Sequence, residues 1–398
     1  MDMIEACFSF FKAGQGAFYG GCINSFFPKN NNHCWKIVYD CGTTNWIKRN
    51  KQSLNKEIDN FKNCCCHFPC DQENKIDLLF ISHFDYDHVS GIKRLLNKFD
   101  VKRVIIPYFP KELRKFAICS YFDTGEPKDD DGLLSNEEYF AFIENPTSFI
   151  SNQSEKTEIF LIKGEKNNEI DYGSYDAEQN DISAVGEIIT DLPEEITTSN
   201  VFFYKNNLQF FIQNKWEFTT YVKEITPLQF QNLETDLKII AGIPITDEIT
   251  YDQIKALLVG TNRTKAHEKY KNHLSDINAH GLVLLHGPIN PWHGFLHSNY
   301  DNHYFNQFDY DLDIGRRTTR QSNIAITVPR LSTLLLGDTS LVGTHSINFP
   351  PNFLSKLESL VVFQVPHHGS DKNWGDIEYN SLVSRSNYFQ SRNRVRNV

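Results

Sequence analysis

Short apolar runs recur along the chain and predict a series of buried strands. Near the start, residues 6–11 and 35–39 are rich in aromatic and β-branched side chains, and they flank a glycine-rich segment from 14 to 21. The run over 76–81 is almost continuously apolar, and a similar run follows over 101–106. Such runs are typical of strands that are buried on both faces.

A helical pattern separates the two buried runs. Ile92, Leu95, Leu96 and Phe99 recur at the spacing of one helix face. A polar segment over 45–62, which is also compatible with a helix, comes before the first buried run. The order strand, polar loop, helix, strand predicts an α/β arrangement, in which ligand sites tend to lie at the carboxyl ends of the strands.

Strand patterns return in the last third of the chain. Residues 281–286 and 360–365 are apolar runs of strand length, and 324–328 and 333–336 are shorter ones. We expect 324–328 and 333–336 to pair as a hairpin, because few residues separate them.

The middle of the chain carries weaker patterns. These predict helices and strands in the following ranges: helices over 137–144, 251–259 and 264–274, and strands over 158–163 and 201–213. No internal repeat or long linker divides the sequence. We therefore predict a single domain over 1–398, with residues 110–280 as an insertion or an elaborated region within it.

The composition is that of a soluble globular protein, with 40% hydrophobic and 23% charged residues. No uncharged apolar run reaches about 18 residues, so we expect no membrane-spanning helix and no membrane partner. The start, MDMIEACFSFF, has no basic segment ahead of a long apolar stretch and resembles a first strand more than a signal peptide. We expect a cytoplasmic location.

The formal net charge is −10. A protein that grips long nucleic acid through its phosphates is usually basic, so this charge argues against broad, non-specific nucleic-acid binding over most of the surface. A local cationic cleft is compatible with this charge, because bound metal ions offset carboxylates. The arginines near 316–320 and in the last residues fit a solvated loop and a solvated tail.

All nine cysteines fall between Cys7 and Cys119. An odd number without a secretory signal favours reduced thiols in the cytosol. The group Cys64–Cys66, with His67 and Cys70, leaves two interpretations open. It could bind an additional zinc ion, but adjacent cysteines lack the two-residue separation of structural zinc sites. The alternative is a reactive or merely exposed loop.

Three of the predicted strands end in residues that bind metals. The strand over 76–81 runs into SHFDYDH, the strand over 333–336 is followed by Asp338, and the strand over 360–365 runs into His367 and His368. Asp338 alone would be interpreted as a turn residue. The histidine pair alone would be interpreted as a hydrogen-bonded pair near the surface. Their shared position at strand ends favours a common metal site.

The loop after residue 81 can supply several ligands at once. His83, Asp85 and Asp87 alternate, so that they can point to one side, and His88 follows directly. Imidazole suits zinc, and carboxylates also suit manganese. Asp338 could bridge two metals through its two oxygens, and a water molecule activated between them would attack an ester at neutral pH.

Taken together, these motifs carry a family resemblance. HFDYDH resembles the HxHxDH signature of the metallo-β-lactamase superfamily. The segments GQGAFYGG, IVYDCG, LLLGDTS and PHHGS resemble, in the same order, the nuclease-like domain of the DNA-uptake competence protein ComEC. The resemblance covers about 6–120 and about 280–375 and leaves the middle uncovered.

The resemblance implies a fold and a site. The implied fold class is α/β, a four-layer αββα metallo-β-lactamase-like sandwich with an insertion in the middle of the chain. The implied site holds two Zn²⁺ ions per chain, or Mn²⁺, in a cleft between the sheets. Its implied metal ligands are His83, Asp85, Asp87, His88, Asp338 and His367. The implied catalytic residues are Asp87, His367 and His368, one histidine of the pair being either a ligand or a group that contacts the substrate.

Two departures from the family pattern stand out. Asp85 occupies the place where the second histidine usually stands, which brings manganese into consideration beside zinc. Relatives of this branch usually carry a further histidine after PHHGS, and none follows Phe389. Either the chain is truncated, or one ligand is missing or comes from elsewhere, with His286, His293 and His297 as spare candidates.

Two classes of function therefore compete. The first is a metal-dependent hydrolase that acts on a phosphodiester or a related ester, with nucleic acid or a nucleotide-like molecule as the substrate favoured by the resemblance. The second is an interaction or regulatory protein that keeps the fold and one metal without turnover, with an unidentified protein partner. Hydrolysis of β-lactams is disfavoured, because Gly337-Asp338 takes the place of the cysteine or histidine arrangement of those enzymes.

Overall fold

The computed structural model describes four stretches of the chain. The described residues are 3–120 with gaps at 15, 27–32, 44–47 and 63–73; 132–164; 182–289 with gaps at 195, 197, 206–207, 225–226, 259–260 and 275–279; and, beyond these, 292–294, 326–328, 332–339, 349, 353, 356–357 and 360–364. The predicted cysteine group at 64–70, together with His297, His367 and His368, lies outside the described residues.

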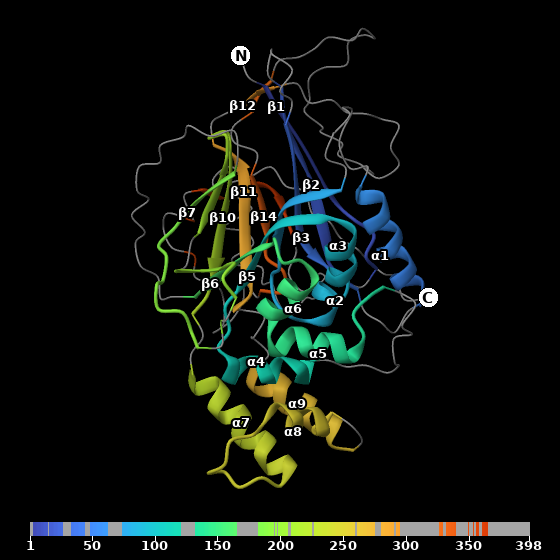
Figure 1. Cartoon of the computed structure of the whole chain (residues 1–398), viewed down its shortest axis with the longest axis vertical. Coiled ribbons are helices and arrows are strands. Elements are labelled where there is room, and N and C mark those ends of the chain that lie inside the picture. The colour runs from blue at the N-terminus through green and yellow to red at the C-terminus, as the bar shows by residue number, and fades with distance from the viewer. Residues whose placement is uncertain are drawn as a thin grey trace, which may run out of the picture.

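One sheet has seven strands in the order β1-β2-β3-β4-β5-β6-β8 (Figure 1). Their bounds are β1 Met3–Phe10, β2 Phe18–Phe26, β3 His33–Cys41, β4 Lys75–Phe80, β5 Asp100–Pro107, β6 Glu158–Lys163 and β8 Val201–Lys205. Strands β1 to β3 pair antiparallel, and β3 to β8 pair parallel. The apolar run after residue 75 is buried in the middle of this sheet, as its composition predicts.

A second sheet has six strands in the order β15-β14-β11-β10-β9-β7. Their bounds are β7 Ile182–Val185, β9 Gln209–Ile212, β10 Trp216–Val222, β11 Leu282–Pro288, β14 Ser332–Leu335 and β15 Leu360–Phe363. The predicted hairpin of 324–328 with 333–336 is wrong. Strand β14 lies between β11 and β15, whereas β13 (Ile326–Val328) pairs with β12 (Trp292–Gly294). Both edges of β14 are therefore occupied by more distant strands.

The helices form two groups. Those that pack near the seven-stranded sheet are α1 Lys48–Phe61, α2 Tyr86–Val89, α3 Ile92–Lys98, α4 Lys111–Ala117 with the short η1 Ile118–Ser120, α5 Asn136–Glu144 and α6 Pro146–Gln153. The second group, which we call the helical lobe, comprises α7 Pro227–Ala241, α8 Tyr251–Leu257 and α9 Asn262–Leu274. Figure 1 shows the helical lobe at one end of the molecule, next to α4.

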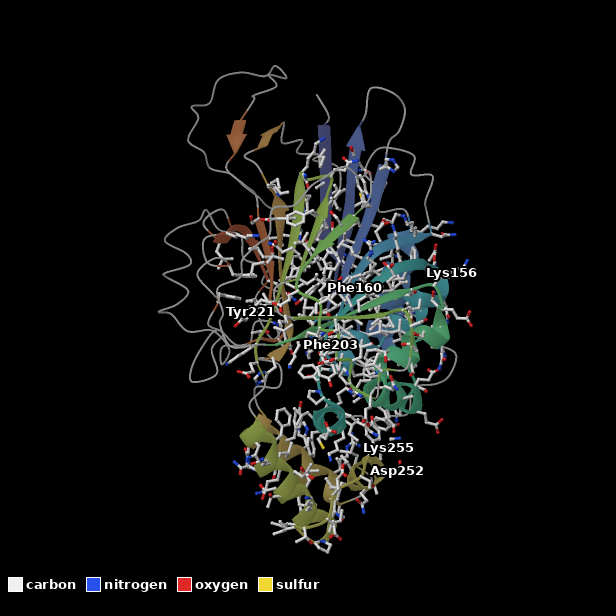
Figure 2. The ribbon with its side chains drawn as sticks, turned by 60° about the vertical axis from the view of Figure 1, so that its left-hand side comes forward. Lys156, Phe160, Phe203, Tyr221, Asp252 and Lys255 are labelled. Atoms are coloured by element: carbon white, nitrogen blue, oxygen red, sulfur yellow. The ribbon has the colours of Figure 1, made fainter. Side chains whose placement is uncertain are left out.

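Three groups of buried apolar side chains hold these layers together. One lies between the seven-stranded sheet and the helices and continues into the helical lobe through Phe230 and Leu237. A second fills the space between the two sheets, where Figure 2 places Phe160. A third covers the other face of the six-stranded sheet, where Tyr221 packs against Phe353. The layer order confirms the predicted α/β sandwich.

The middle of the chain contributes to both sheets. Within 110–280, β6 and β8 extend the first sheet, and β7, β9 and β10 extend the second. The apolar stretch 201–213 is thus two strands in different sheets, where the sequence predicted one. The region also contributes helices α4, α5 and α6 beside the first sheet, and the helical lobe, whose α8 carries Asp252 and Lys255 in Figure 2. The domain division itself stays a prediction. Within the described residues, no helix combines the length and the apolar character needed to cross a membrane.

Candidate metal centre

The loop that leaves the first sheet after β4 is fixed in place by backbone contacts. The Ala17 amide donates to the Asp87 carbonyl at 3.1 Å, and the Leu282 amide donates to the Ser82 carbonyl at 2.6 Å. At Gly42, an added Cβ would lie 2.4 Å from the Asp87 carbonyl oxygen, so only glycine permits this approach. The loop therefore meets both the second strand and the start of β11.

Asp338 reaches the same point from the second sheet. It follows β14 through Gly337, which adopts a φ of 55°, a conformation that favours glycine. A Cβ at Gly337 would lie 2.8 Å from the Cβ and the Oγ of Ser82. The turn after β14 therefore sits directly against the loop after β4, which brings two sequence-distant strand ends together.

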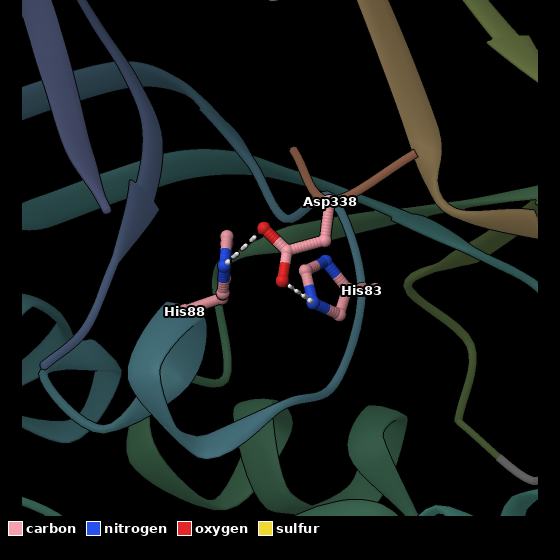
Figure 3. A group of neighbouring side chains, drawn as sticks. All are labelled: His83, His88 and Asp338. Atoms are coloured by element: carbon pink, nitrogen blue, oxygen red, sulfur yellow. Dashed lines mark ion pairs between the residues drawn. The ribbon is translucent and has the colours of Figure 1, made fainter. Parts of the chain in front are cut away.

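Three predicted ligands converge there, as Figure 3 shows. His83, His88 and Asp338 are buried, and one ligand atom from each lies within 4.8 Å of the others. The Nε2 of His88 is 3.3 Å from Asp338 Oδ1, and the Nε2 of His83 is 3.9 Å from Asp338 Oδ2. Among the described residues, this is the group of histidine, cysteine and acidic side chains with the spacing of a metal site.

These separations fit a shared cation. Two ligand atoms about 2.1 Å from a tetrahedral zinc ion lie about 3.4 Å apart, close to the distances above. The Nε2 of His83 is buried and has no hydrogen-bond partner among the described residues. Its separation from Asp85 Oδ2, 3.7 Å, also exceeds hydrogen-bond length. A buried ring nitrogen that faces two carboxylates at such distances suits a metal ligand better than a hydrogen-bonded core histidine.

The other ring nitrogens are fixed by a buried network around Asp40. Ser82 donates to Asp40 twice, from its amide to Oδ1 and from its Oγ to Oδ2, each at 2.7 Å. The Nδ1 of His88 lies 2.8 Å from Asp40 Oδ2, and the Nδ1 of His83 lies 2.8 Å from Ser82 Oγ. Because the carboxylate only accepts and the hydroxyl proton points to it, both Nδ1 atoms donate. Both Nε2 lone pairs then face Asp338, the tautomer that metal binding needs.

Asp40 is the site residue that the sequence did not reveal as such, because at the end of a predicted strand it resembles a turn residue. Its side chain is fully buried, and its backbone has a φ of 56°, which is uncommon outside glycine. The only local signal is a carboxylate that follows an apolar strand, in IVYDCG. Its partners Ser82 and His88 lie more than 40 residues away, so no local pattern predicts the contact.

The electrostatics of the site favour a bound cation. Burial acts to lower the pKa of His88, but the carboxylates of Asp338 and Asp40 outweigh it and hold that pKa well above its ordinary value. The two carboxylates thus stabilise positive charge at the imidazole. A metal ion at the Nε2 position supplies that charge in place of a proton, so metal binding should release a proton.

The remaining predicted ligands are not part of this group of three residues. Asp85 begins α2 as its N-cap residue, and its side chain is 19% exposed beside His83. Asp87 lies in the first turn of α2 and is not part of the three-residue group. His367 and His368 lie outside the described residues, so their roles stay predictions.

The spare candidate His286 lies apart from the group, between the two sheets. Tyr19 contacts its Nε2 at 2.9 Å, and the Trp216 indole donates to its Nδ1 at 3.3 Å. Burial lowers its pKa to about 3. This neutral, hydrogen-bonded imidazole is a core histidine. The side chain of His293, another spare candidate, lies outside the described part of the chain.

Comparison with known proteins supports the part of the site that the loop after β4 contributes. The sequence model of the Metallo-beta-lactamase superfamily matches residues 71–158. This span runs from just before β4 to the start of β6 and includes the loop with His83 and His88, but neither Asp40 nor Asp338. No curated protein matches the chain. The match is compatible with a metal-dependent hydrolase, and it does not extend to the competence-protein branch.

Proposed function

We propose that the protein is a metal-dependent hydrolase of a phosphodiester or a related ester. The observation that carries this proposal is the convergence of His83, His88 and Asp338 from two sheets, with both imidazoles oriented by Asp40 and Ser82. Such support by hydrogen-bonded neighbours is typical of metal sites that must keep a defined geometry. The superfamily match over the same loop supports the proposal independently.

The side chains of this chain would divide the work. His83, His88 and Asp338 would hold a divalent metal, zinc or manganese, which supplies Lewis acidity towards the scissile ester and activates water for attack. Asp40 and Ser82 keep the two imidazoles in the tautomer that presents Nε2. Asp85, which is partly exposed beside His83, and Asp87 would complete a second metal position. His367 and His368 are proposed to assist the oxyanion or the leaving group.

We further propose a nucleic acid or a nucleotide-like molecule as the substrate class. The support is the sequence resemblance of the strand-end motifs. The net charge of −10 speaks for a small or locally bound substrate and against a long duplex held over a wide basic surface. We propose a cytoplasmic location, because the cysteines of the described residues are thiols.

A second function has one observation in its favour. The described residues bring together a single group of three ligands, which is enough for one ion. A protein that holds one structural metal, without turnover, would serve as an interaction or regulatory component with a protein partner. The number of bound metals separates the two functions: about two per chain supports the hydrolase, and one or none supports the binding protein.

The test combines metal content with turnover. Purified protein is loaded with Zn²⁺ or Mn²⁺, its metal content is determined by elemental analysis, and hydrolysis of a bis-aryl phosphodiester is followed. We expect the double variant Asp87→Ala/His88→Ala to lose both metal and hydrolysis. His286→Ala, which removes a histidine of the core, is the control and keeps its metal. If the double variant matches the wild type in both readouts, the proposal fails.

A further inference from the structure

A buried hydroxyl group lies between the two sheets, beside the turn that carries Asp338. It belongs to Tyr39 of β3, whose ring packs among the apolar residues that fill the space between the sheets. The hydroxyl donates to the Leu282 carbonyl at 2.8 Å, and the Leu335 carbonyl lies 3.4 Å away as a longer, weaker contact. Leu282 begins β11 and Leu335 ends β14. One side chain of the first sheet therefore contacts two neighbouring strands of the second.

We propose that Tyr39 is a positioning residue of the metal centre, which sets the place of Asp338 relative to the two histidine ligands. This inference rests on the metal-dependent function proposed above. A Cβ at Gly337, the residue before Asp338, would lie 3.4 Å from the Tyr39 hydroxyl oxygen. The hydroxyl thus packs against the backbone that leads to Asp338, and the Leu335 carbonyl that it approaches belongs to the same turn.

The Leu282 peptide is held through both of its polar groups. Its amide donates to the Ser82 carbonyl at 2.6 Å, and its carbonyl accepts from Tyr39. Since Ser82 leads into the loop with the histidine ligands, β11 is bound to the ends of both β3 and β4. Strand β14 pairs with β11 through Leu335 and Leu284. The end of β14, and with it Asp338, is thereby held in place against the histidine loop.

The metal centre needs such a restraint because its ligands come from different sheets. His83 and His88 follow β4 of the first sheet, and Asp338 follows β14 of the second. Bond lengths to a metal ion are defined to within about 0.2 Å, so a small slide of one sheet over the other moves the carboxylate out of place. The apolar contacts around Tyr39 have no preferred direction, whereas a hydrogen bond does. Tyr39→Phe keeps the packed ring and removes only the directional bond.

The next residue along β3 acts on the other half of the centre. Asp40 lies 2.8 Å from the Nδ1 of His88 and orients that ring within the first sheet. Tyr39 reaches across to the second sheet and acts on the strand that carries Asp338. Two consecutive residues at the end of β3 therefore hold the histidine side and the carboxylate side of the same site.

The test measures zinc Kd in competition with a chromophoric chelator. We expect Tyr39→Phe to raise the zinc Kd about tenfold, the lower end of the effect of residues that support metal ligands. Tyr19→Phe is the matched control. Tyr19 is also buried between the sheets, and its hydroxyl lies 2.9 Å from the Nε2 of His286 on β11, opposite Thr333 of β14. The control thus loses a contact to the same part of the second sheet, further from the metal centre, and should keep the wild-type zinc Kd.

Two further readouts separate positioning from general stability. The visible absorption of the Co²⁺-loaded protein depends on coordination geometry, so it should change in Tyr39→Phe and stay that of the wild type in Tyr19→Phe, even where both variants lose Tm. The zinc titration is also repeated in an Asp338→Ala background. There Tyr39→Phe should change the zinc Kd by less than about twofold, because the ligand that it positions is gone.

The possible failures are distinct. A wild-type zinc Kd in Tyr39→Phe, an equal loss in Tyr19→Phe, or a tenfold loss that persists without Asp338 would overturn the role of Tyr39 and leave the hydrolase standing. The expected pattern of zinc affinities without any ester hydrolysis would count against the hydrolase and support Tyr39 as a positioning residue. A wild type that binds no zinc would overturn both.

Discussion

The buried carboxylate of Asp40 offers the most informative perturbation of the metal centre. It accepts three hydrogen bonds, from the Ser82 amide, the Ser82 hydroxyl and the Nδ1 of His88. It therefore acts on the opposite side of the His88 ring from Nε2, the proposed ligand atom. Asp40→Asn preserves its size. Asparagine also tolerates the positive φ of 56° at this position, so the backbone should be kept.

The expected loss can be worked from the contacts. An asparagine presents one carbonyl oxygen and one amide group, so at least one of the donors at Ser82 or His88 would face an amide that also donates. The negative charge that stabilises the cationic state at His88 is lost as well. Replacement of such an orienting neighbour typically weakens metal affinity by about 10- to 100-fold. This corresponds to about 1.4 to 2.7 kcal/mol at 25 °C.

The assay is a zinc titration in competition with a chromophoric chelator. Asp77→Asn is the matched control, because Asp77 is equally buried and accepts a bond from the Lys36 amide at 3.0 Å, away from the loop. We expect the control to keep the wild-type zinc Kd. Zinc binding by Asp40→Asn that equals the wild type, or an equal loss in both variants, would refute the orienting role of Asp40.

Three further predictions concern stability. Gly337→Ala should lower both Tm and zinc affinity, since its Cβ would lie 2.8 Å from Ser82, whereas Gly242→Ala, at a φ of 70° with nothing within 4 Å, should show backbone strain alone; equal Tm losses and unchanged zinc binding would contradict the packing account. His286 has a folded pKa of about 3 against 6.5 unfolded, so the unfolded chain alone gains a proton as pH falls below 6.5. Between about pH 6 and pH 4, the free energy of unfolding of the wild type in urea should then fall by about 1.4 kcal/mol for each pH unit of acidification, relative to that of His286→Gln. Plots of unfolding free energy against pH that run parallel for the two proteins would show that no such linkage exists. Chelation of the metal should lower Tm, because the stabilisation by a ligand at 100 times its Kd is about 2.7 kcal/mol; a Tm insensitive to chelator would argue against a buried metal.

The sequence predicts the parts of the fold that depend on local patterns. The strands over 76–81 and 101–106 are found as β4 and β5, because strands buried on both faces need continuous apolar side chains. The helix at Ile92 is found as α3, because its apolar side chains recur at the spacing of one helix face. His83, His88 and Asp338 were identifiable because each follows such a strand.

The features that the sequence did not predict depend on long-range contacts. Strand β2 contains Gly20 and Gly21, which in the sequence are typical of a loop. In the structure they lie in a strand, where a Cβ at Gly21 would lie 2.0 Å from the carbonyl oxygen of Cys7 in the neighbouring strand. These glycines serve close packing between elements. The pairing of β14 with β15, in place of a local hairpin, is likewise set by the second sheet as a whole. The contact of Asp40 with His88 spans 48 residues.

The central claim is that His83, His88 and Asp338 hold a metal ion, and its most direct test is the number of tightly bound zinc ions per chain. Equilibrium dialysis followed by elemental analysis would compare the wild type with Asp338→Asn and with His83→Ala/His88→Ala. We predict at least one tightly bound ion in the wild type, weakened binding in Asp338→Asn, and none at this site in the double variant. The same zinc content in all three proteins would contradict the claim.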